Sequence, residues 1–367
     1  MQRRDLLTTT ALAAQATQAQ TAGRVATAVI GTGGRGSNLL DGVIAQPNAK
    51  VAALCDLKAD RLDKAATTAA QDNPKTYRDW HQVVDDKEIE AVFIGTPPHL
   101  HAEMAVAALQ AGKHVYCEKP LGVTAAQVRA VVRAAKASKS VFLTGQQLRS
   151  MKQLQECVRK IHEGVIGEVL WVKAQRHATA DIPRDASSAD WYFDVTKSGG
   201  YLIEQSVHNL DLCNWVINSQ PARACGFGGT QMYKNDPPGR TIFDCATLSY
   251  EYANGVKLSF TQNVFHPRTL PLGGQYIHVF GAKGAVDLMG NYMLHPSGRD
   301  AQPMRLTEKV EEAPHGHIEA FYNTITKNAP SPAGVVIGAT AALTAILGHE
   351  AMVKKSVVEW NDLGVEL

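Results

Sequence analysis

The sequence predicts two domains. An α/β domain built on a doubly wound parallel sheet comes first, and an α+β domain follows with a large, mostly antiparallel open sheet and flanking helices. Up to about residue 146, short apolar segments alternate with helix-like segments, as in a parallel sheet covered on both faces. Beyond it, longer segments alternate between apolar and polar residues, which is typical of an antiparallel sheet with one solvated face. The length of 367 residues also favours two cores.

The first domain, residues 24–146, contains five short apolar segments that we expect to form its sheet: 25–30, 51–55, 91–94, 114–117 and 141–144. Helix-like segments alternate with them at 37–45, 59–71, 101–111 and 124–138. Thr124 is the expected N-cap of the last helix, and Gly112 ends the helix before it. Ligands of such a sheet bind at the carboxyl ends of the strands, so functional residues are expected directly after each strand.

The second domain, residues 147–367, begins with a helix-like segment at 154–163. Strand-like segments with alternating character follow at 169–175, 246–252, 256–263, 276–281 and 285–289, and helices are expected at 318–327 and 334–354. The sheet would leave a broad face exposed in a monomer, and large exposed apolar faces usually mark association. We therefore expect a homodimer or homotetramer.

Composition excludes several classes of function. The formal net charge is +2 and no basic cluster stands out, which gives no electrostatic case for a nucleic-acid partner. No apolar run approaches the roughly 18 residues that span a bilayer. The six cysteines form no CxxC pair and show no ligand-like spacing with histidine, which favours buried free thiols over a disulfide framework or a zinc site.

Residues 1–23 differ from the rest of the chain. Arg3 and Arg4 precede a weak apolar segment at 8–14, a pattern that resembles a twin-arginine (Tat) export signal. We expect a periplasmic protein whose signal is removed or kept as an arm. The alternative is a cytoplasmic protein whose N-terminal arm has no targeting role.

A glycine-rich loop follows the first strand and opens the first helix, with the sequence Gly31-Thr32-Gly33-Gly34-Arg35-Gly36. Gly31 permits a tight turn, Gly33 lets the backbone approach a pyrophosphate, and Gly36 permits close packing of helix on strand. The N-terminus of the helix attracts the negative charge of the phosphates. The loop therefore predicts the dinucleotide site of a Rossmann domain.

Asp56 strengthens this prediction, because it lies twenty residues beyond Gly36 at the end of the second strand. A carboxylate there accepts hydrogen bonds from the ribose hydroxyls and repels a 2′-phosphate, which favours NAD over NADP. Lys58 softens that preference, so NADP stays an alternative. A structural glycine turn with a helix-capping Asp56 is the other interpretation.

Glu118-Lys119-Pro120 lies directly after the strand at 114–117. Together with the glycine loop and the segment 95–101, it resembles the glucose–fructose oxidoreductase, inositol dehydrogenase and MocA-like family. The resemblance continues over nearly the whole chain, through 164–167, 199–208, Asp211, Trp215 and the segment 317–321. It implies that Thr96, Pro97 and His101 lie along the cofactor, although a helix-start role fits His101 equally well.

The resemblance also implies catalytic roles. In the family, the lysine of this motif lies beside the nicotinamide and the hydroxyl being oxidised. Lys119 matches it, with Glu118 as its expected orienting partner, and a cation there stabilises the oxyanion that forms. The family's general acid/base histidine follows an acidic residue by four positions, which His208 matches. The acidic residue is usually Asp and here is Glu204.

Four residues make one helical turn, so Glu204 and His208 are expected to share a helix face. A carboxylate beside the imidazole would raise its basicity and fix its tautomer. The extra methylene of Glu204 leaves open a contact with substrate instead. A plain surface pair is the alternative without function.

Substrate contacts are expected from residues of the second domain. Arg149 falls just past the last strand of the first domain, near the domain junction. Arg176, Trp191 and Tyr192 lie where the second domain of the family covers the sugar. The aromatic pair would stack on sugar C–H surfaces, and core packing is the alternative. No metal site is expected, because His99 and His101 lack carboxylate or cysteine partners.

The sequence therefore predicts hydride transfer between a sugar or polyol hydroxyl and NAD(P). Lys119 and His208 would handle the proton while the cofactor carries the hydride. The first alternative is an NAD-dependent glycosidase or lyase, which oxidises a hydroxyl transiently, eliminates a leaving group and returns the hydride. The second is a non-catalytic sugar or nucleotide sensor.

Overall fold

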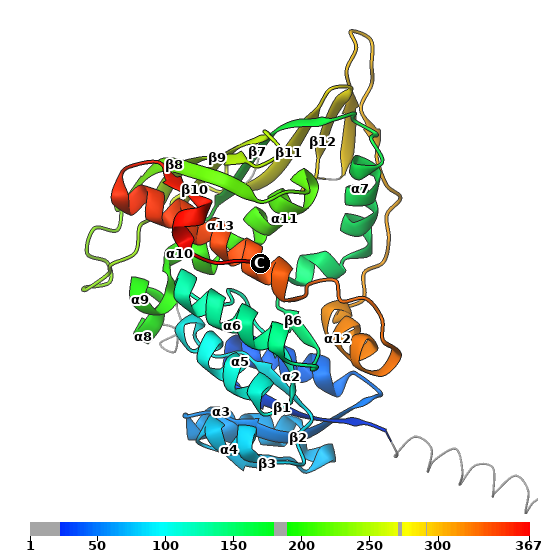
Figure 1. Ribbon diagram of the computed structural model, residues 1–367, viewed down its shortest axis with the longest axis vertical. Helices are drawn as coiled ribbons and strands as arrows, with labels where there is room; N and C mark the ends of the chain where they lie inside the picture. Colours follow the sequence, from blue (N-terminus) through cyan, green and yellow to red (C-terminus); the bar gives the residue numbers. More distant parts are fainter. Residues whose placement is uncertain (1–22, 180–188, 271–273, 291) are drawn as a thin grey trace, which may run out of the picture.

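The computed structural model describes residues 23–179, 189–270, 274–290 and 292–367. It contains a six-stranded sheet in the first half of the chain and a nine-stranded sheet in the second. Figure 1 shows the two sheets at the bottom and the top of the molecule with helices between them. This arrangement confirms the predicted fold class. The Tat-like signal lies almost entirely outside the described residues, so export stays a prediction.

The first sheet is parallel throughout, with the strand order β3-β2-β1-β4-β5-β6. Its strands are β1 Val25–Ile30, β2 Ala49–Cys55, β3 Lys75–Tyr77, β4 Ala91–Ile94, β5 His114–Cys117 and β6 Phe142–Thr144. Its helices are α2 Gly34–Ile44, α3 Ala59–Thr68, α4 Trp80–Asp85, α5 His101–Gln110 and α6 Ala125–Ala137. Every residue of β4 is buried, because helices cover both faces. Five strands were predicted; β3 is a polar edge strand and lacks that apolar pattern.

The second sheet is mixed, with the order β14-β13-β12-β11-β7-β10-β9-β8-β15. β7 and β10 pair in parallel, and the other described pairs are antiparallel. The strands are β7 Val169–His177, β8 Pro221–Gly229, β9 Cys245–Tyr252, β10 Lys257–Asn263, β11 Gln275–Gly281, β12 Gly284–Asp287, β13 Met293–Pro296, β14 Met304–Arg305 and β15 Val358–Glu359. β8 was not predicted, since a proline and three glycines obscure its pattern.

Most helices of the second half lie between the two sheets, whereas α12 packs on the first domain beside α2 (Figure 1). They are α7 Lys152–His162, α8 Ala189–Tyr192, α9 Val195–Ser198, α10 Gly200–Glu204, α11 Val207–Ile217, α12 Gly316–Lys327 and α13 Val335–Lys354. α13 contacts β8 and β9 on one side and α6 and β6 on the other. Two glycines allow this close packing. A Cβ on Gly338 would lie 2.1 Å from Thr144 Oγ1, and one on Gly348 would lie 2.0 Å from Tyr250 Oη.

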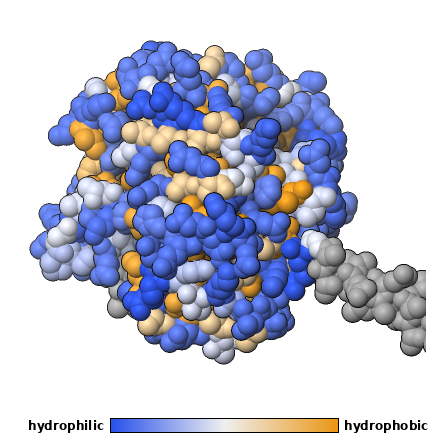
Figure 2. Space-filling view, turned by 60° about the horizontal axis from the view of Figure 1, so that its bottom comes forward, coloured by the Kyte–Doolittle hydropathy of each residue, from blue (hydrophilic) through white to orange (hydrophobic). Residues whose placement is uncertain are grey.

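One helix of the described residues, α13, is long and apolar enough to cross a membrane. However, 67% of its most apolar 18-residue stretch is buried inside the protein. The face of the first domain in Figure 2 is mostly hydrophilic, with small scattered apolar groups.

All six cysteines are free thiols. The prediction that they are buried is wrong for Cys225, which is exposed on β8, and for Cys245, which is half-buried.

Candidate active site

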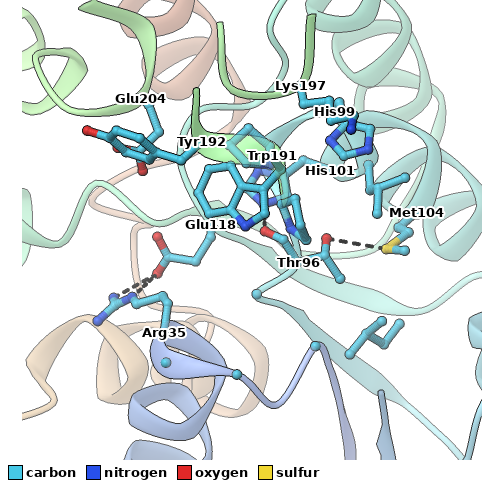
Figure 3. A pocket seen from close by; sticks show the side chains of 18 of the residues that line it. Arg35, Thr96, His99, His101, Met104, Glu118, Trp191, Tyr192, Lys197 and Glu204 are labelled. Atoms are coloured by element: carbon cyan, nitrogen blue, oxygen red, sulfur yellow. Dashed lines mark hydrogen bonds and ion pairs between the residues drawn. The ribbon is translucent and has the colours of Figure 1, made fainter. Parts of the chain in front are cut away.

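A cleft of about 1170 Å³ opens where the carboxyl ends of the first sheet's strands face the second domain. Its lining runs from the glycine loop after β1, through the ends of β2, β4 and β5, to α8, α10 and α11. Ligand pockets are typically about 300–1,000 Å³, so this cleft has room for a dinucleotide and a second small molecule. Figure 3 shows side chains from both domains converging on it.

The glycine loop has the geometry that a bound phosphate needs. Gly31 has a φ of +82°, in the region that favours glycine. A Cβ on Gly36 would lie 1.7 Å from the carbonyl oxygen of Gly31, so only glycine permits this contact between helix and strand. α2 begins at Gly34, and no side chain caps its N-terminus at Gly33. The first amides of α2 are therefore available to an anion in the cleft.

Asp56 lies at the other side of this loop and is 9% exposed. Its Oδ2 accepts hydrogen bonds from the Thr32 amide at 2.7 Å and the Thr32 hydroxyl at 3.2 Å, and its Oδ1 accepts from the Lys58 amide at 2.9 Å. The carboxylate thus ties the loop to the end of β2 while it lines the cleft. Arg61 and Arg78 line the same end and were not predicted, because nothing in their spacing marks them.

Glu118 does not orient the Lys119 side chain, which corrects the prediction. Its Oε1 pairs with Arg35 of the glycine loop, 2.8 Å from Nε and 2.7 Å from Nη2 (Figure 3). Arg35 also lies 3.4 Å from Nε2 of His317 at the start of α12. Burial, and then the charges of Arg35 and His315, lower the pKa of His317 to about 4. Arg35 therefore joins the loop, the end of β5 and α12.

The partner of Lys119 is Glu204. The Lys119 Nζ lies 2.6 Å from the Glu204 carbonyl oxygen and 2.9 Å from its Oε1. Both side chains are about nine-tenths buried, with 13% and 10% exposed. An ammonium group has three N–H donors, and these two contacts use two of them. The third is available to a molecule in the cleft, which both residues line.

The predicted contact between Glu204 and His208 is not made. α10 ends at Glu204 and α11 begins at Val207, so no continuous helix places the two side chains on one face. His208 Nδ1 instead lies 3.1 Å from Oε1 of Gln146. With the amide oxygen of Gln146 facing the ring, Nδ1 carries the proton and Nε2 is left as the acceptor. Sequence reasoning missed Gln146, which follows β6 by two residues.

The basicity of His208 is also opposite to the prediction. Burial is the main cause that lowers its pKa well below the usual value, and the positive charges of Lys119, Arg176 and Arg35 add to the effect. His208 is therefore a neutral imidazole near neutral pH. A neutral imidazole with a free Nε2 is suited to accept a proton from a substrate.

The segment after β4 contributes Thr96, Pro97 and His101 to the cleft lining, and their contact with a cofactor stays a prediction. The His101 ring is 1% exposed and lies 2.7 Å from the Pro120 carbonyl and 2.8 Å from the Thr96 carbonyl. It holds the Thr96 loop against the turn that follows Lys119. Its effect on a cofactor is therefore to position that loop.

The four predicted substrate residues divide into two groups. Arg149 is buried, pairs with Asp211 at 2.8 and 2.9 Å and stacks over Trp215; it does not line the cleft, which corrects the prediction. Arg176, Trp191 and Tyr192 do line it. Tyr192 is 6% exposed in an aromatic cluster, so core packing holds it in place. Figure 3 shows Trp191 projecting into the cleft.

Metal ligands do not gather in the described part of the chain: it contains no group of three or more His, Cys, Asp or Glu side chains that could hold a metal ion.

Residues 25–146 match a family described as an oxidoreductase family with an NAD-binding Rossmann fold, GFO/IDH/MocA, and residues 154–287 match the C-terminal domain of that family. The inositol 2-dehydrogenase of Salmonella typhimurium is 34% identical over 174 residues, which are 46% of this chain and 47% of that protein. The chain thus matches about half the length of that relative.

The myo-inositol 2-dehydrogenase of Thermotoga maritima is 24% identical over 258 residues, covering 70% of this chain and 73% of that protein. A solved structure of a levoglucosan dehydrogenase in complex with NADH and L-sorbose has a TM-score of 0.77 at 20% identity, and covers 93% of this chain and 100% of that one. At this identity the similarity shows the same fold.

Proposed function

Because this chain belongs to the GFO/IDH/MocA family of oxidoreductases with an NAD-binding Rossmann domain, we propose that it transfers a hydride between a sugar or polyol hydroxyl and NAD. The observation that supports this best is the pairing of two groups in one cleft. A lysine with one spare N–H donor and a neutral histidine with a free Nε2 both line the cleft that the glycine loop opens.

The residues around the loop fit a dinucleotide. Without a side-chain cap, the first amides of α2 are free to bind a pyrophosphate, and Asp56, which lines the cleft at the end of β2, would accept from the adenosine ribose hydroxyls. Gly33 leaves space that a Cβ would fill, 2.9 Å from Arg61 Nη1. Thr96 and Pro97 then line the path from the loop to Lys119. When bound, NAD supplies the hydride acceptor.

The protein's own groups handle the proton and the charge. His208 Nε2 takes the proton of the substrate hydroxyl, and the low pKa of the imidazole keeps it unprotonated before the reaction. The spare N–H of Lys119 donates to the hydroxyl oxygen and stabilises the negative charge that develops there. Glu204 holds the ammonium in position through its carboxylate and its carbonyl.

A sugar or polyol substrate is supported by the names of the relatives, which act on inositol and levoglucosan. The test is to purify the protein, release bound nucleotide with acid and identify it, then add sugars, polyols and aryl-glycosides to the NAD-loaded protein. A rise in NADH absorbance with a sugar or polyol is the expected result. Release of an aglycone without net NADH would instead establish the glycosidase alternative, and no turnover would favour a sensor.

We also propose that the outer face of the second sheet joins two copies of the chain. Trp171 on β7 stacks on Phe280 of β11 with ring centroids 5.1 Å apart, and Trp171 is 39% exposed. Phe227 on β8 is 78% exposed. Light scattering should give a dimer or tetramer mass, and a monomer mass at micromolar concentration would contradict this.

A further inference from the structure

At the end of the cleft that Lys119 and His208 line, which we call the chemical end, the other lysine and arginine side chains pair with carboxylates, and Arg176 does not. Arg35 pairs with Glu118, Lys119 pairs with Glu204, and Lys197 lies 3.7 Å from Asp194. Arg176 lines the same region and has no carboxylate partner among the described residues. Asp190, the remaining acidic lining residue there, is exposed to solvent.

Arg176 is held by amide oxygens instead. Its Nη1 lies 2.8 Å from Oε1 of Gln275 and 3.4 Å from Oδ1 of Asn209, and its Nη2 lies 3.0 Å from Oε1 of Gln205. A guanidinium has five N–H donors, so these three contacts leave two of them. The Nε is buried without a partner among the described residues. Neutral amides orient the guanidinium in the cleft wall without neutralising its charge.

Arg176 is connected to the proposed catalytic residues Lys119 and His208. Gln205, which accepts from Arg176, donates from Nε2 to Oε2 of Glu204, and the other oxygen of that carboxylate binds Lys119. Two side chains thus link the guanidinium to the lysine. The positive charge of Arg176 is also one of the causes that lower the pKa of His208.

We propose that the substrate is a sugar or polyol that carries an anionic group, a carboxylate or a phosphate, and that Arg176 binds this group. The inference rests on the proposed function and specifies its substrate class. A guanidinium in a partly buried wall is stabilised by an anion, and the remaining N–H of Nη2 can donate to an oxygen of a carboxylate or phosphate. An anion on Arg176 would complete the charge pairing of the chemical end.

The first experiment compares matched substrates on the NAD-loaded enzyme. Each neutral compound is paired with its anionic counterparts, for example glucose with glucuronate and glucose 6-phosphate, and galactose with galacturonate. We expect an anionic member to have a kcat/KM about 100-fold above its neutral counterpart. The carboxylate and phosphate arms show which anion is preferred. Equal or better turnover of the neutral members would overturn the inference and leave the dehydrogenase activity intact.

The second experiment changes the guanidinium. Arg176→Gln keeps hydrogen-bonding capacity but removes the charge, and should lower kcat/KM for the anionic substrate about 100-fold while NADH binding, measured by fluorescence, stays unchanged. Arg176→Lys keeps the charge without the planar fork and should lose less. Arg133→Gln is the matched control, because Arg133 is exposed on α6 and lies outside the cleft lining.

Measurements of sugar binding distinguish failure of the proposed anion site from failure of the proposed dehydrogenase activity. If no sugar is turned over but the anionic compounds still bind the NADH-loaded protein and lose binding in Arg176→Gln, the anion site stands and the dehydrogenase activity fails. If Arg176→Gln has the same selectivity between anionic and neutral sugars as the wild type, the anion site is refuted. Loss of NADH binding in Arg176→Gln would also refute it, because the arginine would then serve the nucleotide.

Discussion

The two ends of the cleft are built in different ways. At the adenosine end, the contacts come mainly from backbone: the turn at Gly31, the first amides of α2, and the amides of Thr32 and Lys58 that Asp56 accepts. These residues lie within one segment of the chain, from Gly31 to Lys58, and the longest of these contacts spans 24 residues. At the chemical end, side chains from more distant segments meet: Lys119 and Glu204 are 85 residues apart, and His208 and Gln146 are 62 apart. The first end is thus built mainly from backbone of one βαβ unit, and the second from long-range pairs of side chains.

The largest effect is expected at the chemical end, from Lys119→Met. The variant loses the cation that stabilises the developing oxyanion, and kcat should fall about 10³-fold while the dissociation constant for NADH stays unchanged. Stopped-flow turnover and fluorescence titration measure the two quantities. Lys64→Met, on the exposed face of α3, is the matched control. A comparable loss of NADH affinity would show that the two ends are not independent.

The next effect is expected from His208→Asn, which removes the proton acceptor and should lower kcat about 10²-fold. The pH profile tests the mechanism. The base works when neutral, and its pKa is lowered, so wild-type kcat should stay level as pH falls through 6.5 and decline only at lower pH. The variant should lack that decline. A wild-type midpoint at or above pH 6.5 would contradict the assignment of a buried, neutral imidazole.

The smallest of the three effects is expected at the adenosine end, from Asp56→Ala. The variant should bind NAD about 10-fold more weakly and bind NADP better than the wild type does. The carboxylate no longer repels a 2′-phosphate, and Arg61 and Arg78 line the same end. Isothermal titration with both nucleotides measures this. Asp63→Ala, exposed on α3, is the control. Unchanged affinity for both nucleotides would refute the ribose contact.

The same contrast explains which parts of the molecule could be predicted from the sequence. The glycine loop, Asp56 and the apolar strands follow from spacing and periodicity, because local backbone geometry decides them. Glu118 and Lys119 are neighbours just past the end of β5, but their side chains pair with Arg35 and Glu204, which lie 83 and 85 residues away. No local sequence pattern predicts that Arg35 is the partner of Glu118.

The wrong prediction of a contact between Glu204 and His208 has a related cause. The prediction assumed one continuous helix, but the chain breaks between α10 and α11, and the break turns the two side chains apart. Arg149 was placed correctly near the domain junction. Its buried partner Asp211 lies 62 residues away, and the ion pair removes it from the cleft. Partners of this kind depend on tertiary packing, which spacing does not encode.

The tight packing of α13 has a consequence for the reaction itself. Gly338 meets Thr144 of the nucleotide-binding half, and Gly348 meets Tyr250 of the other half. The proposed hydride transfer needs its two reacting atoms about 3–3.5 Å apart. A methyl group at Gly338 would displace α13 from β6, and would thereby shift the second domain against the nucleotide-binding half. We therefore expect Gly338→Ala to lower turnover, although α13 contributes no side chain to the cleft lining.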